Sequence, residues 1–124
     1  MEILTETIKA ESLKSFQSTI RKSENALSSM TEKGANTTLV SKRLQALRIG
    51  LAVLEQVWDG KSHPYTHEDL AETRILLAAL LPSIEGIYAK SKSGSPQKTL
   101  LERRIKSLEL ALQEMDDSTD KDLS

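Results

Sequence analysis

Two stretches of the chain, TLVSKRLQALRIGLAVLE at residues 38–55 and TLLERRIKSLELALQEMD at residues 99–116, decide the fold that the sequence predicts. The second stretch follows the first by 61 positions, and this shift aligns identical residues: Thr38 with Thr99, Leu39 with Leu100, Arg43 with Arg104, Leu47 with Leu108, and Leu51 with Leu112. Most other aligned pairs are conservative, and weaker matches continue upstream at the same shift, as for Glu11 with Glu72. An internal repeat of this length indicates a duplicated structural unit.

Apolar residues in both stretches recur three and four positions apart, which is the spacing of an α-helix with one buried face. The same spacing upstream of each stretch predicts two further helices. The four predicted helices span residues 5–30, 38–58, 67–90 and 96–115. Because the connections between them are short, consecutive helices are expected to be antiparallel neighbours.

Local signals mark where two of these helices begin. Thr66 and Asp69 have the spacing of a capping box at the start of the third helix. Ser95 precedes Pro96, which is a favourable order because a proline in the first turn lacks an N–H group that would be unpaired there anyway.

Other signals mark helix ends and interruptions. Gly34 and Gly94 are expected to end the preceding helices in a left-handed conformation. Pro82 lies inside the third helix, and we expect it to kink that helix or to restart it.

We therefore predict an all-α fold, an antiparallel four-helix bundle made of two tandem helical hairpins that form a pseudo-two-fold repeat. The hairpins span residues 5–58 and 66–115, within a single domain of residues 1–115. Residues 116–124 are expected to form an acidic, flexible tail. Small residues on the second and fourth helices are expected to let helices approach closely: Ala46, Gly50, Ser107 and Ala111.

Composition narrows the classes of function. Hydrophobic residues make up 38% of the chain and aromatic residues 3%, so the core must be aliphatic, and the net charge of −1 gives no overall attraction to nucleic acid or membrane. The lack of cysteine excludes disulfides, thiol catalysis and cysteine-based zinc sites. The longest apolar run, residues 75–81, is far shorter than the ~20 residues that cross a bilayer. The first residues lack the pattern of a signal peptide, so we expect a cytoplasmic protein.

The two histidines do not form a convincing catalytic or metal site. His63 and His67 are four residues apart, but Pro64 lies between them and disfavours helical angles at the residue before it. We therefore expect their rings not to share a helix face, and we predict no metal, no cofactor and no enzymatic activity. An enzyme or metal protein that uses His63 and His67 is retained as a third alternative.

Basic residues gather near the two turns that join the helices of each hairpin. In an aligned bundle both turns lie at one end, together with the starts of the second and fourth helices, whose free N–H groups favour anions. Arginines and hydroxyl groups there would suit a phosphate-bearing ligand. The predicted ligand-binding residues are Arg43, Arg104, Lys42, Arg103, Lys98, Ser95, Thr38 and Thr99. The alternative is a solvated basic rim that only aids solubility.

The third helix carries more apolar residues than one buried face requires. Ile75, Leu76 and Leu80 add a second apolar face beside Leu77 and Leu81. A helix that is apolar over most of its circumference is usually central or shared between subunits. We therefore predict a homodimer or higher oligomer with these three residues in its interface.

These features favour a non-catalytic helical binding protein that takes an anionic small ligand, such as a nucleotide, at the basic turns. The alternative is a protein–protein interaction adaptor that uses the apolar face of the third helix and binds no small ligand. Nucleic acid is not expected as a partner, because the chain has too few aromatic residues to form a stacking platform.

YTHEDL at residues 65–70 and KSGSPQKTLLERRIKSLELAL at residues 92–112 resemble a group of small helical-hairpin proteins from Gram-positive bacteria, their phages and mobile elements. These carry a GSPQ-x-TLL-x-x-RIKAL type motif once. In the first copy, residues 34–37 read Gly-Ala-Asn-Thr in place of that GSPQ element. This resemblance implies a bacterial or phage origin and a helical hairpin, and it brings no known activity.

More remotely, each hairpin is similar to that of phage sponge proteins, in having a threonine–leucine helix start with a basic residue one turn later. Such proteins sequester cyclic nucleotide signals and oligomerise. This second resemblance implies a nucleotide as the ligand.

Overall fold

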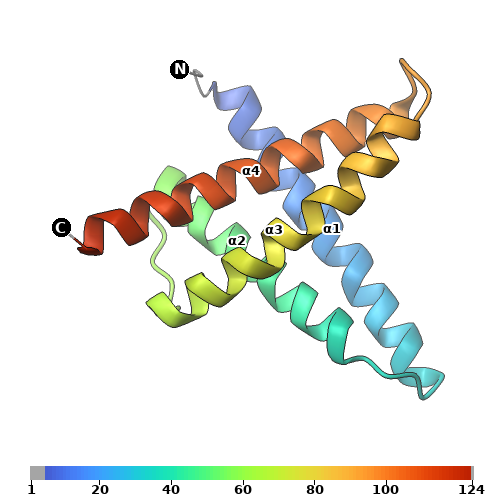
Figure 1. Cartoon of the computed structure of the whole chain (residues 1–124), viewed down its shortest axis with the longest axis horizontal. Helices are drawn as coiled ribbons and strands as arrows, with labels where there is room; N and C mark the ends of the chain where they lie inside the picture. Colours follow the sequence, from blue (N-terminus) through green and yellow to red (C-terminus); the bar gives the residue numbers. More distant parts are fainter. Residues whose placement is uncertain (1–4, 124) are drawn as a thin grey trace.

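The computed structural model describes the backbone of residues 5–123 and the side chains of residues 5–116. The described residues form four α-helices: α1 (Glu6–Glu32), α2 (Thr38–Asp59), α3 (His67–Lys90) and α4 (Pro96–Leu123). α1 and α2 form one antiparallel hairpin, and α3 and α4 form the other (Figure 1). The predicted all-α, antiparallel four-helix bundle is confirmed.

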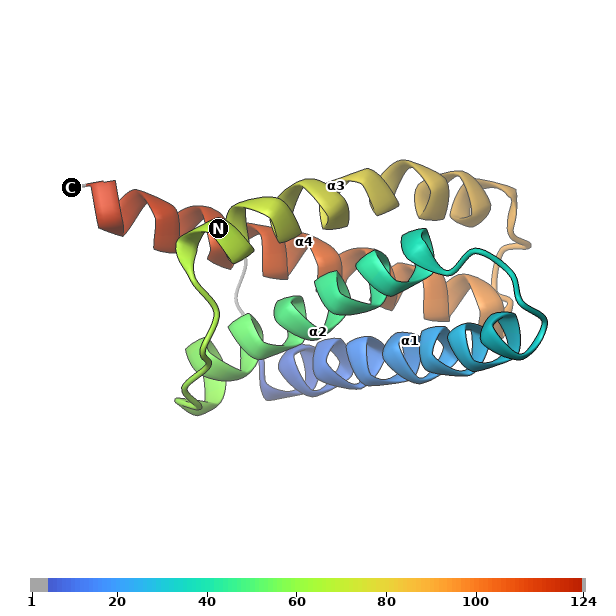
Figure 2. The ribbon, with the colours of Figure 1, turned by 90° about the horizontal axis from the view of Figure 1, so that it is seen from below.

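The two hairpins cross instead of lying parallel. Figure 1 shows α1 lying across α4, and Figure 2 shows the α1–α2 hairpin and the α3–α4 hairpin as two superposed layers. α2 and α4 contact each other, and each of them also contacts α1 and α3. They therefore form the centre of the bundle. α1 and α3 lie outside, and among the described residues no Cα atom of α1 lies within 8 Å of one in α3.

Caps confirm the predicted helix starts. The Thr66 hydroxyl accepts a hydrogen bond from the Asp69 N–H at 3.2 Å, and the Asp69 carboxylate accepts one from the Thr66 N–H at 3.0 Å. This reciprocal pair is the predicted capping box. At the start of α4 the Ser95 hydroxyl accepts from the Lys98 N–H at 3.1 Å.

The end of α1 is closed by a glycine turn. Gly34 has a left-handed φ of 72°, and the N–H of the next residue, Ala35, bonds to the Met30 carbonyl at 2.9 Å. Gly94 is also left-handed, with a φ of 79°, although α3 already ends at Lys90. Gly34 therefore closes α1 as predicted, whereas α3 ends before Gly94, at the extended residue Ser91, and Gly94 lies in the turn that follows.

Two helices continue past positions where the sequence predicts a possible break or an end. α3 continues through Pro82 without restarting, because proline's φ is compatible with a helix and the packed bundle compensates for the one lost hydrogen bond. α4 does not end at Met115 but continues to Leu123, since no glycine or proline stops it there. Asp116, predicted to begin the tail, pairs with Arg74 of α3. The side chains of residues 117–124 and the backbone of residue 124 lie outside the described residues.

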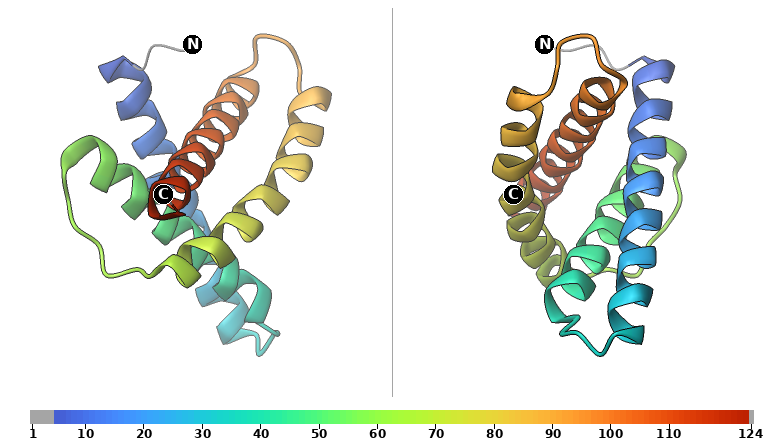
Figure 3. Two further views of the ribbon diagram at one scale, coloured as in Figure 1. Left: turned by 60° about the vertical axis from the view of Figure 1, so that its left-hand side comes forward. Right: turned by 90° about the vertical axis from the view of Figure 1, so that its right-hand side faces the viewer.

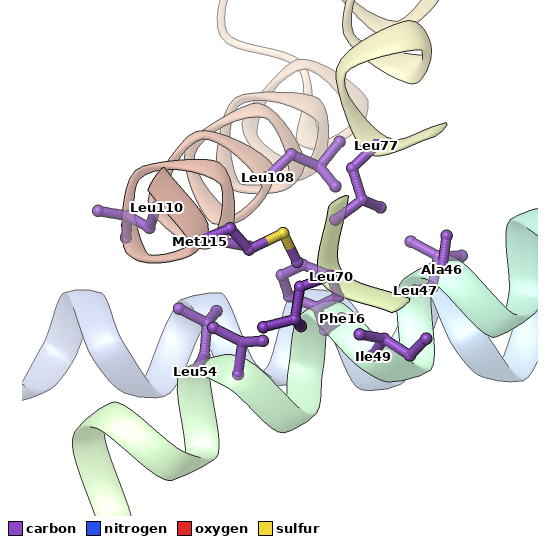
Figure 4. Close-up of a cluster of buried hydrophobic side chains, with 12 residues drawn as sticks. Phe16, Ala46, Leu47, Ile49, Leu54, Leu70, Leu77, Leu108, Leu110 and Met115 are labelled. Carbon is purple, nitrogen blue, oxygen red and sulfur yellow. The ribbon is translucent and has the colours of Figure 1, made fainter. Parts of the chain in front are cut away.

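The core is aliphatic around a single phenylalanine, as the composition predicts. Figure 4 shows Phe16 of α1, Leu77 of α3 and Met115 of α4 directed toward one another. Several pairs of residues 61 positions apart are buried together, as for Phe16 with Leu77 (1% and 0% exposed). The pairs Leu47 with Leu108 and Ala46 with Ser107 are also buried together. This correspondence supports the duplication, which stays a prediction. Among the described residues, no helix has the length and apolar character that crossing a bilayer requires.

Gly50 of α2 lies close to side chains of both α1 and α3. A Cβ atom at this position would lie 3.0 Å from Cε1 of Phe16 and 3.1 Å from Cδ1 of Leu77. Both of these side chains are buried, so a methyl group here would require them to shift within the packed core. Close packing therefore requires a residue without a side chain at this point of α2.

We predict that Gly50→Ala is less stable than Gly86→Ala by about 1–3 kcal/mol, the usual cost of overpacking a core. Gly86 is a matched control, because it lies inside α3 with nothing within 4 Å of an added Cβ. Both substitutions gain the same helix propensity, about 0.5–1 kcal/mol, so their difference isolates the contact. Urea unfolding measures it, and equal stabilities would show that the crossing tolerates a methyl group.

Candidate anion-binding groove

The two hairpin turns lie at the same end of the long axis of the molecule, but they are separated from each other across that end. Figures 1 and 2 show both turns on the right-hand side, and in the right panel of Figure 3, which faces that side, the turn after α3 lies at the top and the turn after α1 at the bottom. Both turns therefore lie at one end, as predicted, but the crossing of the hairpins keeps them apart. Lys42 and Arg43, which follow the first turn, do not line either of the two cavities that contain Arg103.

A groove lies instead between the first halves of α1 and α4. It holds a larger cavity of about 590 Å³ and a smaller one of about 160 Å³. We call the larger one the mixed compartment, and its lining residues are Ile8, Glu11, Ser12, Tyr88, Thr99, Glu102, Arg103, Ile105, Lys106 and Glu109. We call the smaller one the basic compartment, and its lining residues are Glu11, Lys14, Ser15, Ser18, Lys22, Leu100, Arg103 and Arg104.

An ion pair separates the two compartments. Glu11 of α1 and Arg103 of α4 line both cavities, and their charged atoms are 3.5 Å apart. This distance exceeds the 2.7–2.9 Å of a tight charge-assisted hydrogen bond. Arg103 is therefore held near the boundary without being locked to Glu11.

The basic compartment carries an excess of positive charge. Four of its lining residues are cationic: Lys14, Lys22, Arg103 and Arg104. Glu11 is the one acidic residue in this lining, and it already pairs with Arg103. The hydroxyl groups of Ser15 and Ser18 add neutral hydrogen-bonding groups to the same wall.

Arg104 is the most unusual side chain of the groove. Its Nε atom is buried and has no hydrogen-bond partner among the residues that the structure describes. Burial lowers the pKa of the Arg104 guanidinium from its usual value, because the charged form has lost part of its hydration. A buried donor without a partner costs free energy that a bound acceptor would recover. Arg43, its counterpart in the repeat, is exposed.

Several predicted ligand-binding residues have other partners. Lys98 places its ammonium group 4.6 Å from the ring centre of Tyr88, in a cation–π contact. Ser95 caps α4, and the Thr99 hydroxyl donates to the Ser95 carbonyl at 3.5 Å while Thr99 lines the mixed compartment. Thr38 is exposed, and its N–H donates to the Asn36 side chain. Of the eight predicted residues, only Arg103 and Arg104 line the basic compartment.

The α1 side of the groove was not predicted. Lys14, Ser18 and Lys22 recur every four residues, so they occupy one face of α1 together with Glu11 and Ser15. The positions 61 residues later in α3 read Ile75, Leu76, Ala79 and Ser83. The sequence signal for the α1 side of the groove is the difference between these two faces. The face of α1 carries two lysines, whereas the corresponding positions of α3 carry no cationic residue.

The histidines lie apart from the groove. His63 precedes α3, and its Nδ1 accepts a hydrogen bond from the Tyr65 N–H at 3.2 Å. His67 is the first residue of α3, so the two rings do not share a helix face, as predicted. Among the described residues, no group of three or more histidines and carboxylates is placed to hold a metal ion.

The predicted interface on α3 is only partly exposed. Ile75 is 68% exposed, which is the largest exposure among the bulky apolar residues described. Leu76 and Leu80 are instead partly buried and pack against the core of the same chain. The second apolar face is therefore smaller than the sequence predicts, because the crossed hairpin covers part of it.

Comparisons with protein-family models, curated proteins and solved structures find no match for this chain.

We predict that Arg104→Met raises the free energy of unfolding by about 1–3 kcal/mol, the usual penalty of an unsatisfied buried donor. Methionine keeps the unbranched apolar stem and removes the unpartnered Nε atom. Arg43→Met is the matched control, because an exposed substitution changes stability by less than about 0.5 kcal/mol. Urea unfolding in phosphate-free buffer measures both. A destabilised Arg104→Met variant would contradict the assignment of an unsatisfied guanidinium.

Proposed function

We propose that this protein is a non-catalytic binding protein whose ligand carries a phosphate or a similar compact oxyanion, held in the basic compartment. The observation that carries the proposal is Arg104, a half-buried arginine with an unpartnered Nε that lines a cavity together with three further cations. A bound oxyanion would accept hydrogen bonds from this guanidinium group and balance the positive charge of the lining.

Phosphate matches the chemistry of this lining. Arginine presents several N–H donors in a planar fork that fits phosphate oxygens, and such charge-assisted bonds are about twice as strong as neutral ones. Lys14 and Lys22 add two ammonium groups from the opposite helix. The volume of about 160 Å³ is sufficient for one phosphate group, since a water molecule occupies about 30 Å³ in the liquid.

The lining supports binding more than catalysis. Ser15 and Ser18 are the hydroxyl groups in the basic compartment, and a serine nucleophile needs an adjacent base. Neither compartment is lined by histidine, the usual base for that role. Glu11, the nearest carboxylate in the lining, pairs with Arg103.

We predict that the protein binds inorganic phosphate and that Arg104→Gln raises the dissociation constant at least tenfold. This follows from the loss of charge-assisted hydrogen bonds, worth about 1.5–3 kcal/mol, because tenfold corresponds to about 1.4 kcal/mol. Isothermal titration calorimetry in a phosphate-free buffer at low ionic strength measures the affinity. Circular dichroism checks that the variant remains helical.

Arg43→Gln is the matched control for this experiment. Arg43 occupies the equivalent position of the first copy but lines neither compartment, so its substitution should leave phosphate affinity unchanged. Loss of affinity in both variants would indicate general attraction to positive charge. No phosphate binding by the unaltered protein would overturn the proposal.

A protein–protein adaptor that works through α3 is the second candidate. The exposure of Ile75 favours it, since a large aliphatic side chain that is 68% exposed suits an interface. A homodimer or higher oligomer through the same residue belongs to this candidate. Light scattering at tens of micromolar tests self-association independently of phosphate binding.

A further inference from the structure

We propose that the ligand is a phosphate monoester of an organic group rich in hydroxyl or amino donors, and that the mixed compartment disfavours a second anionic group on the organic part of that ligand. This inference rests on the proposed function, because the phosphate in the basic compartment sets which part of the ligand reaches the mixed compartment.

The size of the groove indicates more than a free anion. The mixed compartment has a volume of about 590 Å³, within the range of about 300–1,000 Å³ that small organic ligands occupy. A phosphate ion alone would fill the smaller cavity and leave this space to water. A ligand that spans both compartments must therefore add an organic part to its phosphate.

Arg103 joins the two compartments at the point where such a ligand would cross. Its guanidinium lines both cavities, and the 3.5 Å separation from Glu11 leaves its donors able to bond a phosphate ester oxygen. A ligand phosphate placed here would contact Arg103 and Arg104 from α4 and Lys14 from α1. The ester-linked group would then point into the mixed compartment.

The charges of the mixed compartment differ from those of the basic one. Apart from the Glu11–Arg103 pair, its charged lining residues are Glu102, Lys106 and Glu109, so carboxylates outnumber ammonium groups. Carboxylates only accept hydrogen bonds, so they favour hydroxyl and amino groups on the ligand. A second phosphate would instead meet the like charges of these two carboxylates.

The same compartment has an apolar side that suits the carbon skeleton of the ligand. Ile8 and Ile105 contribute aliphatic surface from α1 and α4. Tyr88 adds an aromatic ring and a phenolic hydroxyl from α3, the only contribution of that helix to this lining. Apolar walls with a few polar groups are the usual composition of a small-ligand site.

Two matched pairs of ligands test this selectivity by calorimetry: adenosine 5′-monophosphate with adenosine 3′,5′-bisphosphate, and glucose 6-phosphate with glucose 1,6-bisphosphate. We expect at least one monoester to bind ten times more tightly than inorganic phosphate. We expect its bisphosphate partner to bind at least fivefold more weakly than that monoester. Comparison of the adenosine pair with the glucose pair shows whether the organic group of the ligand is a nucleoside or a sugar.

The double variant Glu102→Gln, Glu109→Gln tests the physical cause. It should abolish the difference between monoester and bisphosphate while leaving the affinity for inorganic phosphate unchanged, because both residues line only the mixed compartment. Glu85→Gln, an exposed substitution on α3 outside both linings, should change neither affinity.

Three results would overturn the inference: monoesters no tighter than inorganic phosphate, bisphosphates as tight as their monoesters, or unchanged selectivity in the double variant. In each of these cases, phosphate binding that still depends on Arg104 leaves the proposed function intact. Loss of all phosphate binding would overturn both.

Discussion

The close approach of the two hairpins at their crossing governs the rest of the molecule. A Cβ atom at position 50 would lie only about 3 Å from the side chains of Phe16 and Leu77, so the helices approach closely at Gly50. Ala46 on α2, with Ser107 and Ala111 on α4, is also small and buried, so the central helices can contact each other directly. Helices that cross at a central contact diverge away from it. The groove between α1 and α4 lies in that diverging region.

Crossing also places equivalent residues in different surroundings. Arg43 and Arg104 match in the repeat, yet Arg43 is exposed while Arg104 is half-buried with an unpartnered Nε. The face of α1 beside Arg104 is cationic and hydroxyl-rich, whereas the corresponding face of α3 carries Ile75 and Leu76. α1 therefore contributes polar groups to the groove, whereas the corresponding face of α3 contributes apolar side chains.

The sequence predicts the helices well and the site only in part. The four helices, the capping box at Thr66 and the buried small residues at Gly50 and Ala111 follow from local spacing and propensity, which the structure obeys. The crossing of the hairpins could not be predicted from the sequence, because the spacing of apolar residues along a helix does not determine the angle between the two layers of helices. Arg43, predicted to lie beside Arg104, lines neither compartment of the groove. Arg103 and Arg104 were identified by their charge, but their partners on α1 depend on that angle.

Nuclear magnetic resonance of the arginine side chains offers the most direct test of an oxyanion held by Arg104. The Nε–Hε signals of Arg104 and Arg43 can be followed in one titration with inorganic phosphate. We expect the Arg104 signal to shift and saturate together with the backbone amides of Ser15 and Ser18, while the Arg43 signal stays in place. A stationary Arg104 signal, or a shift confined to the residues of the two hairpin turns, would contradict binding in the groove.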